Sequence, residues 1–99
     1  MAQSASKPIE IPKEKIKDIK FSENDVLVTK EEQLQRKIDL QRAATLGAQS
    51  KANIKIYFVD AESKRHRVVA TVWATTESNV SFKGEVMVPI KSIYQVGFF

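Results

Sequence analysis

The chain has 99 residues, with 16 lysines and arginines against 12 aspartates and glutamates, one histidine and no cysteine. One domain is expected at this length, and the lack of cysteine excludes a disulfide framework and a cysteine-based zinc site. No stretch approaches the roughly 20 apolar residues of a membrane-spanning helix. Residues 1–20 carry five lysines and lack the apolar core of a secretory signal. We therefore expect a cytoplasmic protein without a membrane partner.

The first region, residues 1–29, is predicted to be a flexible, basic N-terminal arm. Residues 1–8 are small and polar, which is typical of a disordered terminus. Two prolines disfavour a helix near the start of the arm, and we expect it to dock in part through Ile9 and Ile11. The rest of the chain, 30–99, is predicted to form a helix plus a small β-barrel domain.

A helix is predicted over residues 30–46. Thr29 opens a capping box, good helix formers follow it, and Gly47 stands where a left-handed residue often ends a helix. Leu34 and Ile38 are one turn apart and share a face. We therefore expect these two side chains to be buried against the barrel.

Five short strands are predicted from residue 53 onward, because apolar residues alternate with other residues between polar turns. The predicted strands are 54–59, 65–75, 80–82, 86–90 and 93–96. The second is apolar on both faces, which indicates a strand that is buried twice or bends to serve two sheets. Pro89 marks the edge or end of the fourth strand because it cannot donate to a ladder.

This order of elements resembles the SH3-like small barrels, and among them the Sm-like family, which includes the bacterial Sm-like RNA chaperone. The run 86–96, VMVPIKSIYQV, carries the resemblance, since it is similar to the hydrophobic strand, single turn and Ile-x-x-Val ending of that family. The resemblance implies a mainly β fold with one N-terminal α-helix and a five-stranded barrel. The Tyr-Lys-His run that holds uridine in the bacterial family is replaced by Pro89, Ile90 and Lys91, so of that run a positive charge remains.

The densest basic run is Lys64-Arg65-His66-Arg67, at the end of a polar turn. Such side chains neutralise phosphates with a salt-dependent affinity, although charge runs are also often simply solvated. With Lys91 added, the candidate nucleic-acid-binding residues are Lys64, Arg65, Arg67 and Lys91.

The aromatic residues leave alternatives open. Trp73 either stacks on a base or, as is commoner for a tryptophan between β-branched neighbours, lies in the core under the helix. Tyr57 and Tyr94 face the same choice. Phe98 and Phe99 form either a hydrophobic tail that covers the barrel or an exposed docking peptide.

Nothing in the sequence indicates catalysis. His66 is the single histidine, and a metal site or catalytic dyad needs convergent partners. The nearest acids, Asp60 and Glu62, lie in the same turn and are expected to be exposed, with ordinary pKa values. The three glycines form no phosphate-binding loop. We expect no enzyme activity, no metal and no cofactor.

The leading hypothesis is a non-enzymatic binding module that contacts RNA or ribonucleoprotein through its basic turn and N-terminal arm. The alternative is a protein-interaction or scaffold module whose arm, helix or C-terminal tail binds a partner protein. The strand region is short for a stable core, and unpaired strand edges invite pairing with a second copy. We expect self-association, with a dimer favoured over a ring because Pro89 removes one ladder donor.

Overall fold

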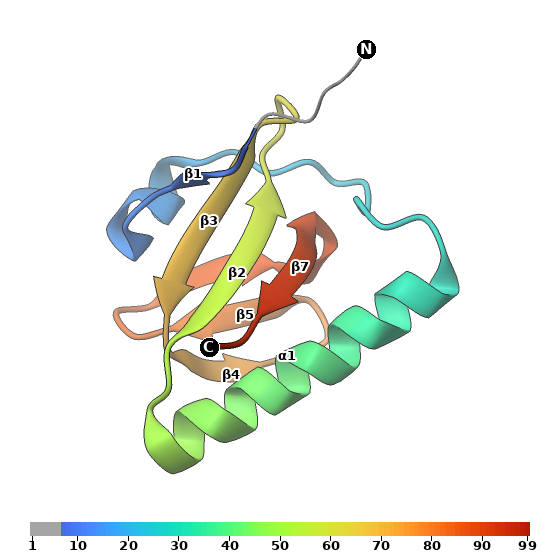
Figure 1. The fold of residues 1–99 in the computed structure, drawn as a ribbon. Coiled ribbons are helices and arrows are strands. Elements are labelled where there is room, and N and C mark those ends of the chain that lie inside the picture. The colour runs from blue at the N-terminus through green and yellow to red at the C-terminus, as the bar shows by residue number, and fades with distance from the viewer. Residues whose placement is uncertain (1–6) are drawn as a thin grey trace.

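The structure, a computed structural model, describes residues 7–99. Most of the terminus predicted to be disordered, residues 1–8, lies outside the described part. Residues 7–99 form one main helix and seven strands in two sheets, neither of which closes into a barrel (Figure 1). The mainly β fold with one helix ahead of the predicted strands is thus confirmed. Within the described residues, no helix has the length and hydropathy needed to cross a bilayer.

The first sheet has the strand order β1-β3-β2-β7 and the second the order β4-β5-β6. The strands are β1 (Ile9–Glu10), β2 (Ile54–Val59), β3 (Arg65–Ala70), β4 (Val72–Thr75), β5 (Asn79–Phe82), β6 (Val86–Pro89) and β7 (Ile93–Gly97). Neighbours are antiparallel except β1 and β3, which are parallel. The long second strand of the prediction is divided at Thr71 between β3 and β4. Its two apolar faces therefore reflect a bend that serves two sheets.

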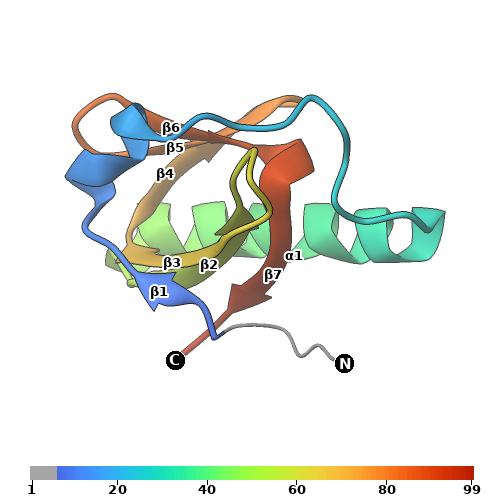
Figure 2. The same cartoon turned by 90° about the horizontal axis from the view of Figure 1, so that it is seen from above.

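The two sheets face each other and enclose the core (Figure 2). Alternate strand residues point inward, as the period-2 pattern predicted for β2; the buried strand residues are Ile54, Ile56, Phe58, Val68, Ala70, Val72, Val80, Phe82, Val88 and Ile93. Helical segments close the two open sides between the sheets. The helix α1 (Lys30–Ser50) contacts β4 and β7, and the 3-10 helix η1 (Lys13–Asp18) contacts β6 and β3.

Of the two residues predicted to dock the N-terminal segment, Ile11 does so and Ile9 does not, and the main anchor is Ile16. Ile16 in η1 is fully buried in the core, whereas Ile9 is exposed and Ile11 packs at the margin. The two residues of β1 extend the first sheet, and Ile11 N donates to the carbonyl oxygen of Arg67 at 2.9 Å. The six-residue 3-10 helix buries one residue, so it leaves no repeating pattern in the sequence.

The helix α1 begins as predicted but ends later. Thr29 Oγ1 accepts a hydrogen bond from Glu32 N at 3.1 Å, which is the capping contact. Gly47 does not end the helix; Lys51 does, with φ at 54° in the left-handed region. Gly47 instead allows close packing, because a Cβ there would collide with the carbonyl oxygen of Val72.

The buried face of α1 is not the predicted one. Leu34 and Ile38 are 58% and 49% exposed. The residues buried on this helix are Arg36, Leu40, Ala43 and Gly47. A hydropathy pattern does not predict this buried face, because the face contains an arginine and a glycine. Arg36 is tolerated there because Asp25 and the carbonyl oxygen of Ile93 accept hydrogen bonds from its guanidinium.

Candidate nucleic-acid interface

The β2–β3 hairpin positions three of the four predicted binding residues. Asp60 sets its turn, since Asp60 Oδ1 accepts hydrogen bonds from Glu62 N at 2.8 Å and Lys64 N at 2.9 Å. Lys64 follows at the tip, and Arg65 opens β3 opposite Val59. Because side chains alternate along a strand, Arg65 and the next but one residue, Arg67, project from the outer face of the first sheet.

Asp60 is not the exposed carboxylate that was expected, whereas Glu62 is exposed. The Asp60 side chain is 12% exposed, and its Oδ2 lies 2.8 Å from His66 Nε2. Burial alone would raise the pKa of Asp60, but hydrogen bonds from His66 and from the main-chain N–H groups of Lys64 and Glu62 outweigh burial and lower it. The His66 ring stacks on Phe58, with centroids 5.3 Å apart. The Asp60–His66 pair thus stabilises the hairpin.

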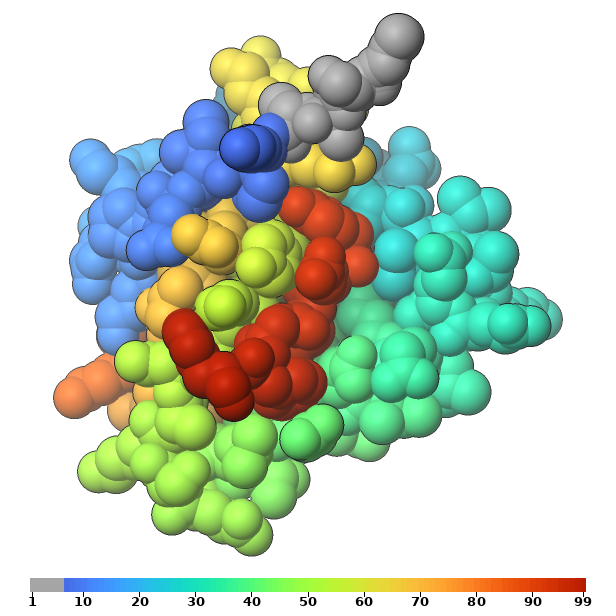
Figure 3. All heavy atoms as spheres, viewed as in Figure 1, coloured from blue at the N-terminus to red at the C-terminus, as the bar shows by residue number. Residues whose placement is uncertain are grey.

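Two tyrosines share the outer face with these arginines. The rings of Tyr57 and Tyr94 are 6.0 Å apart between centroids and tilted by 53°. The guanidinium carbon of Arg65 lies 5.1 Å from the Tyr94 ring centre, and that of Arg67 lies 6.0 Å from the Tyr57 ring centre. We call Tyr57, Tyr94, Arg65 and Arg67 the tyrosine–arginine face. The first sheet, from whose outer face these side chains project, is on the side of the molecule turned toward the viewer in Figure 3.

The electrostatics of this face favour an anionic ligand. Burial raises the pKa of Tyr94, while the charge of Arg65 opposes the rise. The Tyr94 phenol is therefore neutral at physiological pH and keeps its hydrogen-bond donor. Arg67 NH2 lies 2.6 Å from Glu10 Oε1 on β1, but this ion pair is solvent-exposed. Exposed pairs contribute about 0–1 kcal/mol, so a phosphate can replace the Glu10 carboxylate.

The C-terminal residues extend the face on the side of β7. Phe98 packs at the margin of the core, and the guanidinium carbon of Arg42 lies 4.4 Å above its ring. Phe99 is 80% exposed, and Lys55 Nζ lies 4.5 Å from its ring centre. Each predicted alternative thus holds for one phenylalanine: Phe98 covers the core, and Phe99 is exposed.

Lys64 and Lys91 are not part of the tyrosine–arginine face. Lys64 is exposed at the hairpin tip, 4.0 Å from Glu62. Lys91 lies in the 3-10 turn η2 (Ile90–Ser92), and its Nζ donates to the carbonyl oxygen of Glu23 at 3.0 Å. The structure therefore groups Arg65 with Arg67, leaves Lys64 at the margin and directs Lys91 to the N-terminal segment.

Sequence reasoning missed the pairing of aromatic and basic residues. Tyr57 lies opposite Arg67 in the β2–β3 register, and counting outward from the polar turn would have found this pair. The placement of Trp73 in the core is wrong, because its side chain is 61% exposed. Among residues 7–99, no group of three histidines, cysteines or acids is placed to hold a metal ion.

Comparison with known proteins gives no relative on which this face can be matched: no protein-family model matches the chain, and no curated protein or solved structure matches it significantly. The resemblance to the Sm-like family therefore stays a prediction. Function is inferred below from the geometry of the face.

Proposed function

We propose that this protein is a non-enzymatic binding module that contacts single-stranded RNA, free or in ribonucleoprotein, through the tyrosine–arginine face. One observation carries the proposal: two tyrosine rings and two guanidinium groups lie together on one sheet. Guanidinium groups bind phosphates, and tyrosine rings stack on unpaired bases. Under this proposal the two sheets are an opened SH3-like barrel of the Sm-like kind, extended by β1.

The geometry explains why a strand of RNA suits this face better than a duplex. Stacking requires bases that are unpaired and free to turn their planes toward the protein. Tyr57 and Tyr94 are adjacent, so two successive bases can be accommodated. The guanidinium groups of Arg65 and Arg67 lie over the Tyr94 and Tyr57 rings, so bases that stack on these rings would bring phosphates of the same strand within reach of the arginines.

The test is fluorescence anisotropy with a labelled uridine-rich single strand at low and at moderate salt. The wild type should bind, with an affinity that falls as salt rises. The Arg65→Gln/Arg67→Gln variant should bind at least about tenfold more weakly, because two charge-assisted contacts are lost. The matched control is Lys30→Gln/Lys37→Gln, which removes the same charge from α1 and should retain most of the affinity.

Two results would contradict the proposal. One is no binding by the wild type at about 50 mM salt, where phosphate contacts are strong. The other is an equal loss in the arginine variant and the lysine control, which would show that net charge alone governs binding. Circular dichroism should confirm that both variants are folded.

A second candidate function, protein interaction through α1, is favoured by a different observation. Leu34 and Ile38 are one turn apart and exposed, in the N-terminal half of α1. The N-terminal end of this helix extends beyond the sheets in Figure 2. Adjacent exposed apolar residues are typical of interaction surfaces. If this surface mediates the expected self-association, light scattering should report a dimer that Leu34→Glu/Ile38→Glu converts to a monomer. RNA binding that survives this change would separate the two functions.

A further inference from the structure

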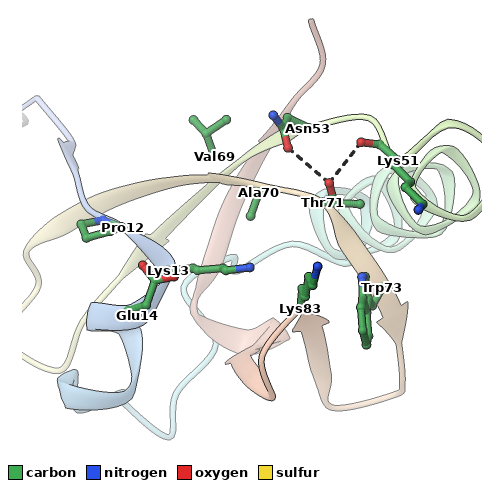
Figure 4. Close-up of a pocket in the computed structure, with 10 residues that line it drawn as sticks. All are labelled: Pro12, Lys13, Glu14, Lys51, Asn53, Val69, Ala70, Thr71, Trp73 and Lys83. Carbon is green, nitrogen blue, oxygen red and sulfur yellow. Dashed lines mark hydrogen bonds between the residues drawn. The ribbon is translucent and has the colours of Figure 1, made fainter.

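An open hollow of about 490 Å³ lies where β3 passes into β4 (Figure 4). Its walls come from separate parts of the chain: Lys13 in η1, Trp73 in β4 and Lys83 after β5. Small-ligand sites commonly measure roughly 300–1,000 Å³, so the hollow is large enough for a nucleotide. Neither Lys13 nor Lys83 was singled out in the sequence, because their juxtaposition depends on the fold.

Trp73 is turned toward this hollow by an irregularity in its strand. Val72 pairs with Phe82 and Ala74 with Ser81, so the register shifts by one residue across Trp73. A β-bulge of this kind redirects a side chain and is over-represented beside functional sites. The indole stands along one wall, next to Lys83 (Figure 4), and it is 61% exposed. Tryptophan is highly buried on average. A ligand that covers the exposed Trp73 indole would therefore remove its apolar surface from water.

The ammonium groups give the hollow its charge. In Figure 4 the side chain of Lys13 extends across the opening toward Lys83, which stands beside Trp73, and Lys51 lies at the far rim. Within residues 7–99 none of these three lysines forms an ion pair. Glu14 is the one carboxylate on the rim. An anion between Lys13 and Lys83 would relieve the repulsion of two like charges.

The back wall of the hollow is held by the main chain and by one hydroxyl. Thr71 Oγ1 donates to the carbonyl oxygen of Lys51 at 3.1 Å and lies 3.2 Å from Asn53 Oδ1 (Figure 4). Lys51 ends α1, and Thr71 is the bend between the sheets. These hydrogen bonds tie the segment that follows α1 to the bend between the sheets. The wall is therefore held in place, and a ligand would enter a preformed site.

We propose that this hollow binds one nucleotide, with the base stacked on Trp73 and the phosphate between Lys13 and Lys83. Base–aromatic stacking and lysine–phosphate contacts both tolerate any base. Three consecutive residues where β3 ends, Val69, Ala70 and Thr71, line the hollow, and Arg67 lies two residues before the first of them. The nucleotide is thus either free or one unit of a strand that continues onto the tyrosine–arginine face. Binding of a nucleotide within a strand rests on the proposed function, whereas binding of a free nucleotide does not.

The experiment uses the intrinsic fluorescence of Trp73, which is the single tryptophan of the chain. Uridine 5′-monophosphate, uridine, inorganic phosphate and a short uridine oligonucleotide are titrated separately into the full-length protein. The monophosphate should quench the emission at lower concentration than uridine, because the phosphate adds the lysine contacts. A much tighter response to the oligonucleotide would identify the strand as the source, and equal affinities would identify the free nucleotide.

The matched pair of variants keeps the charge change constant. Lys13→Gln/Lys83→Gln should weaken nucleotide binding at least about tenfold, since two charged contacts are lost. Lys15→Gln/Lys17→Gln removes two neighbouring lysines of η1 that do not line the hollow, and it should bind like the wild type. Equal weakening in both variants would overturn the site.

The outcome is also separable from that of the proposed function. Arg65→Gln/Arg67→Gln should leave the response of Trp73 to the monophosphate unchanged, whatever it does to the oligonucleotide. If neither the monophosphate nor the oligonucleotide changes the emission of Trp73, the nucleotide site is wrong. If the arginine variant loses oligonucleotide binding but keeps its response to the monophosphate, the loss is assigned to the tyrosine–arginine face and the nucleotide site stands.

Discussion

At the scale of single residues, Arg36 is the buried charge that most constrains the fold. Its NH1 donates to Asp25 Oδ1 at 2.9 Å and to the carbonyl oxygen of Ile93 at 3.0 Å, and its NH2 lies 2.7 Å from Asp25 Oδ2. Asp25 Oδ1 also accepts from Leu27 N at 2.8 Å. Arg36 thereby joins α1 to the N-terminal segment and to β7. Asp25 and the Ile93 carbonyl oxygen accept hydrogen bonds from guanidinium N–H groups that would otherwise be buried without a partner.

Replacement of Asp25 tests this joint. Asp25→Ala leaves the buried Arg36 guanidinium without its counter-charge; because Asp25 itself is 25% exposed, the cost should lie at the lower end of the about 3–5 kcal/mol found when a buried pair is broken. Urea denaturation should show a loss of that order in the free energy of unfolding. Glu31→Ala, at an exposed position in the first turn of α1, should change stability far less. A near-wild-type Asp25→Ala variant would show that Arg36 is solvated in solution.

The two partly buried aspartates also predict the response to acid. Burial raises the pKa of Asp25, but hydrogen bonds from Arg36 and Leu27 N and the charges of Arg36 and Lys91 outweigh it and lower the pKa from its ordinary value. The pKa of Asp60 is lowered in the same way. A lowered folded-state pKa contributes stability that is full above the unfolded value and is lost as pH falls through the folded value.

Melting temperature should therefore fall as the pH drops below about 4. Asp25→Asn/Asp60→Asn should melt at a lower temperature near neutrality and show a flatter acid limb. The comparison is made by circular dichroism across both variants and the wild type. An acid limb of unchanged steepness in the double variant would assign acid sensitivity to other carboxylates.

At the scale of elements, the contact between α1 and β4 depends on a residue without a side chain. A Cβ at Gly47 would meet the Val72 carbonyl oxygen and Thr71 Cγ2. The oxygen belongs to the main chain and cannot rotate away, so the helix would have to move. Alanine is a better helix former than glycine by about 1 kcal/mol. Helix propensity alone would therefore make Gly47→Ala stabilising, whereas the collision with Val72 would make it destabilising.

Gly47→Ala should destabilise the protein by about 1–3 kcal/mol despite the gain in helix propensity. Gln49→Ala, at an exposed position two residues on, provides the control and should be neutral or slightly stabilising. Thermal unfolding of the two variants decides the point. Stabilisation by Gly47→Ala would mean that the helix and β4 stand further apart.

At the scale of the whole molecule, the core is closed by two helical segments that both precede β2 in the chain. Ile16 from η1 fills one open side of the two sheets, and Leu40 and Ala43 from α1 fill the other. The N-terminal segment is thus part of the core as well as a link to the tyrosine–arginine face through Glu10.

Truncation of Ile16 measures the contribution of η1. Ile16→Ala should cost about 2–5 kcal/mol in the free energy of unfolding, as expected for a fully buried isoleucine. Ile9→Ala, at an exposed position in β1, should cost less than about 0.5 kcal/mol. Equal values in urea titrations would show that η1 does not close the core.

Sequence patterns predicted the features that repeat along the chain. The alternation at Ile54, Ile56 and Phe58 gave a strand with one buried face, and Thr29 correctly marked the start of α1. Patterns failed where packing depends on contacts between distant segments. Arg36 and Gly47 are buried for reasons that hydropathy does not register.

The candidate site was predicted in part for the same reason. Arg65 and Arg67 are neighbours in sequence, so their density was visible there, and both lie on the outer face. Tyr57 pairs with Arg67 within one hairpin, whereas Tyr94 and the walls of the hollow at Trp73 come from segments distant in sequence. Such long-range groupings depend on how the segments pack in the fold, which a single sequence leaves open.

The closure of the core by α1 and η1 has a consequence for synthesis on the ribosome. Both segments emerge before the strands on which they pack: η1 packs on β6, and α1 on β4 and β7. Neither can bury its apolar residues until those strands have emerged. The nascent chain therefore carries Ile16 and Leu40 exposed until β6 and β7 are available, and folding is dominated by contacts between residues distant in sequence, which form slowly.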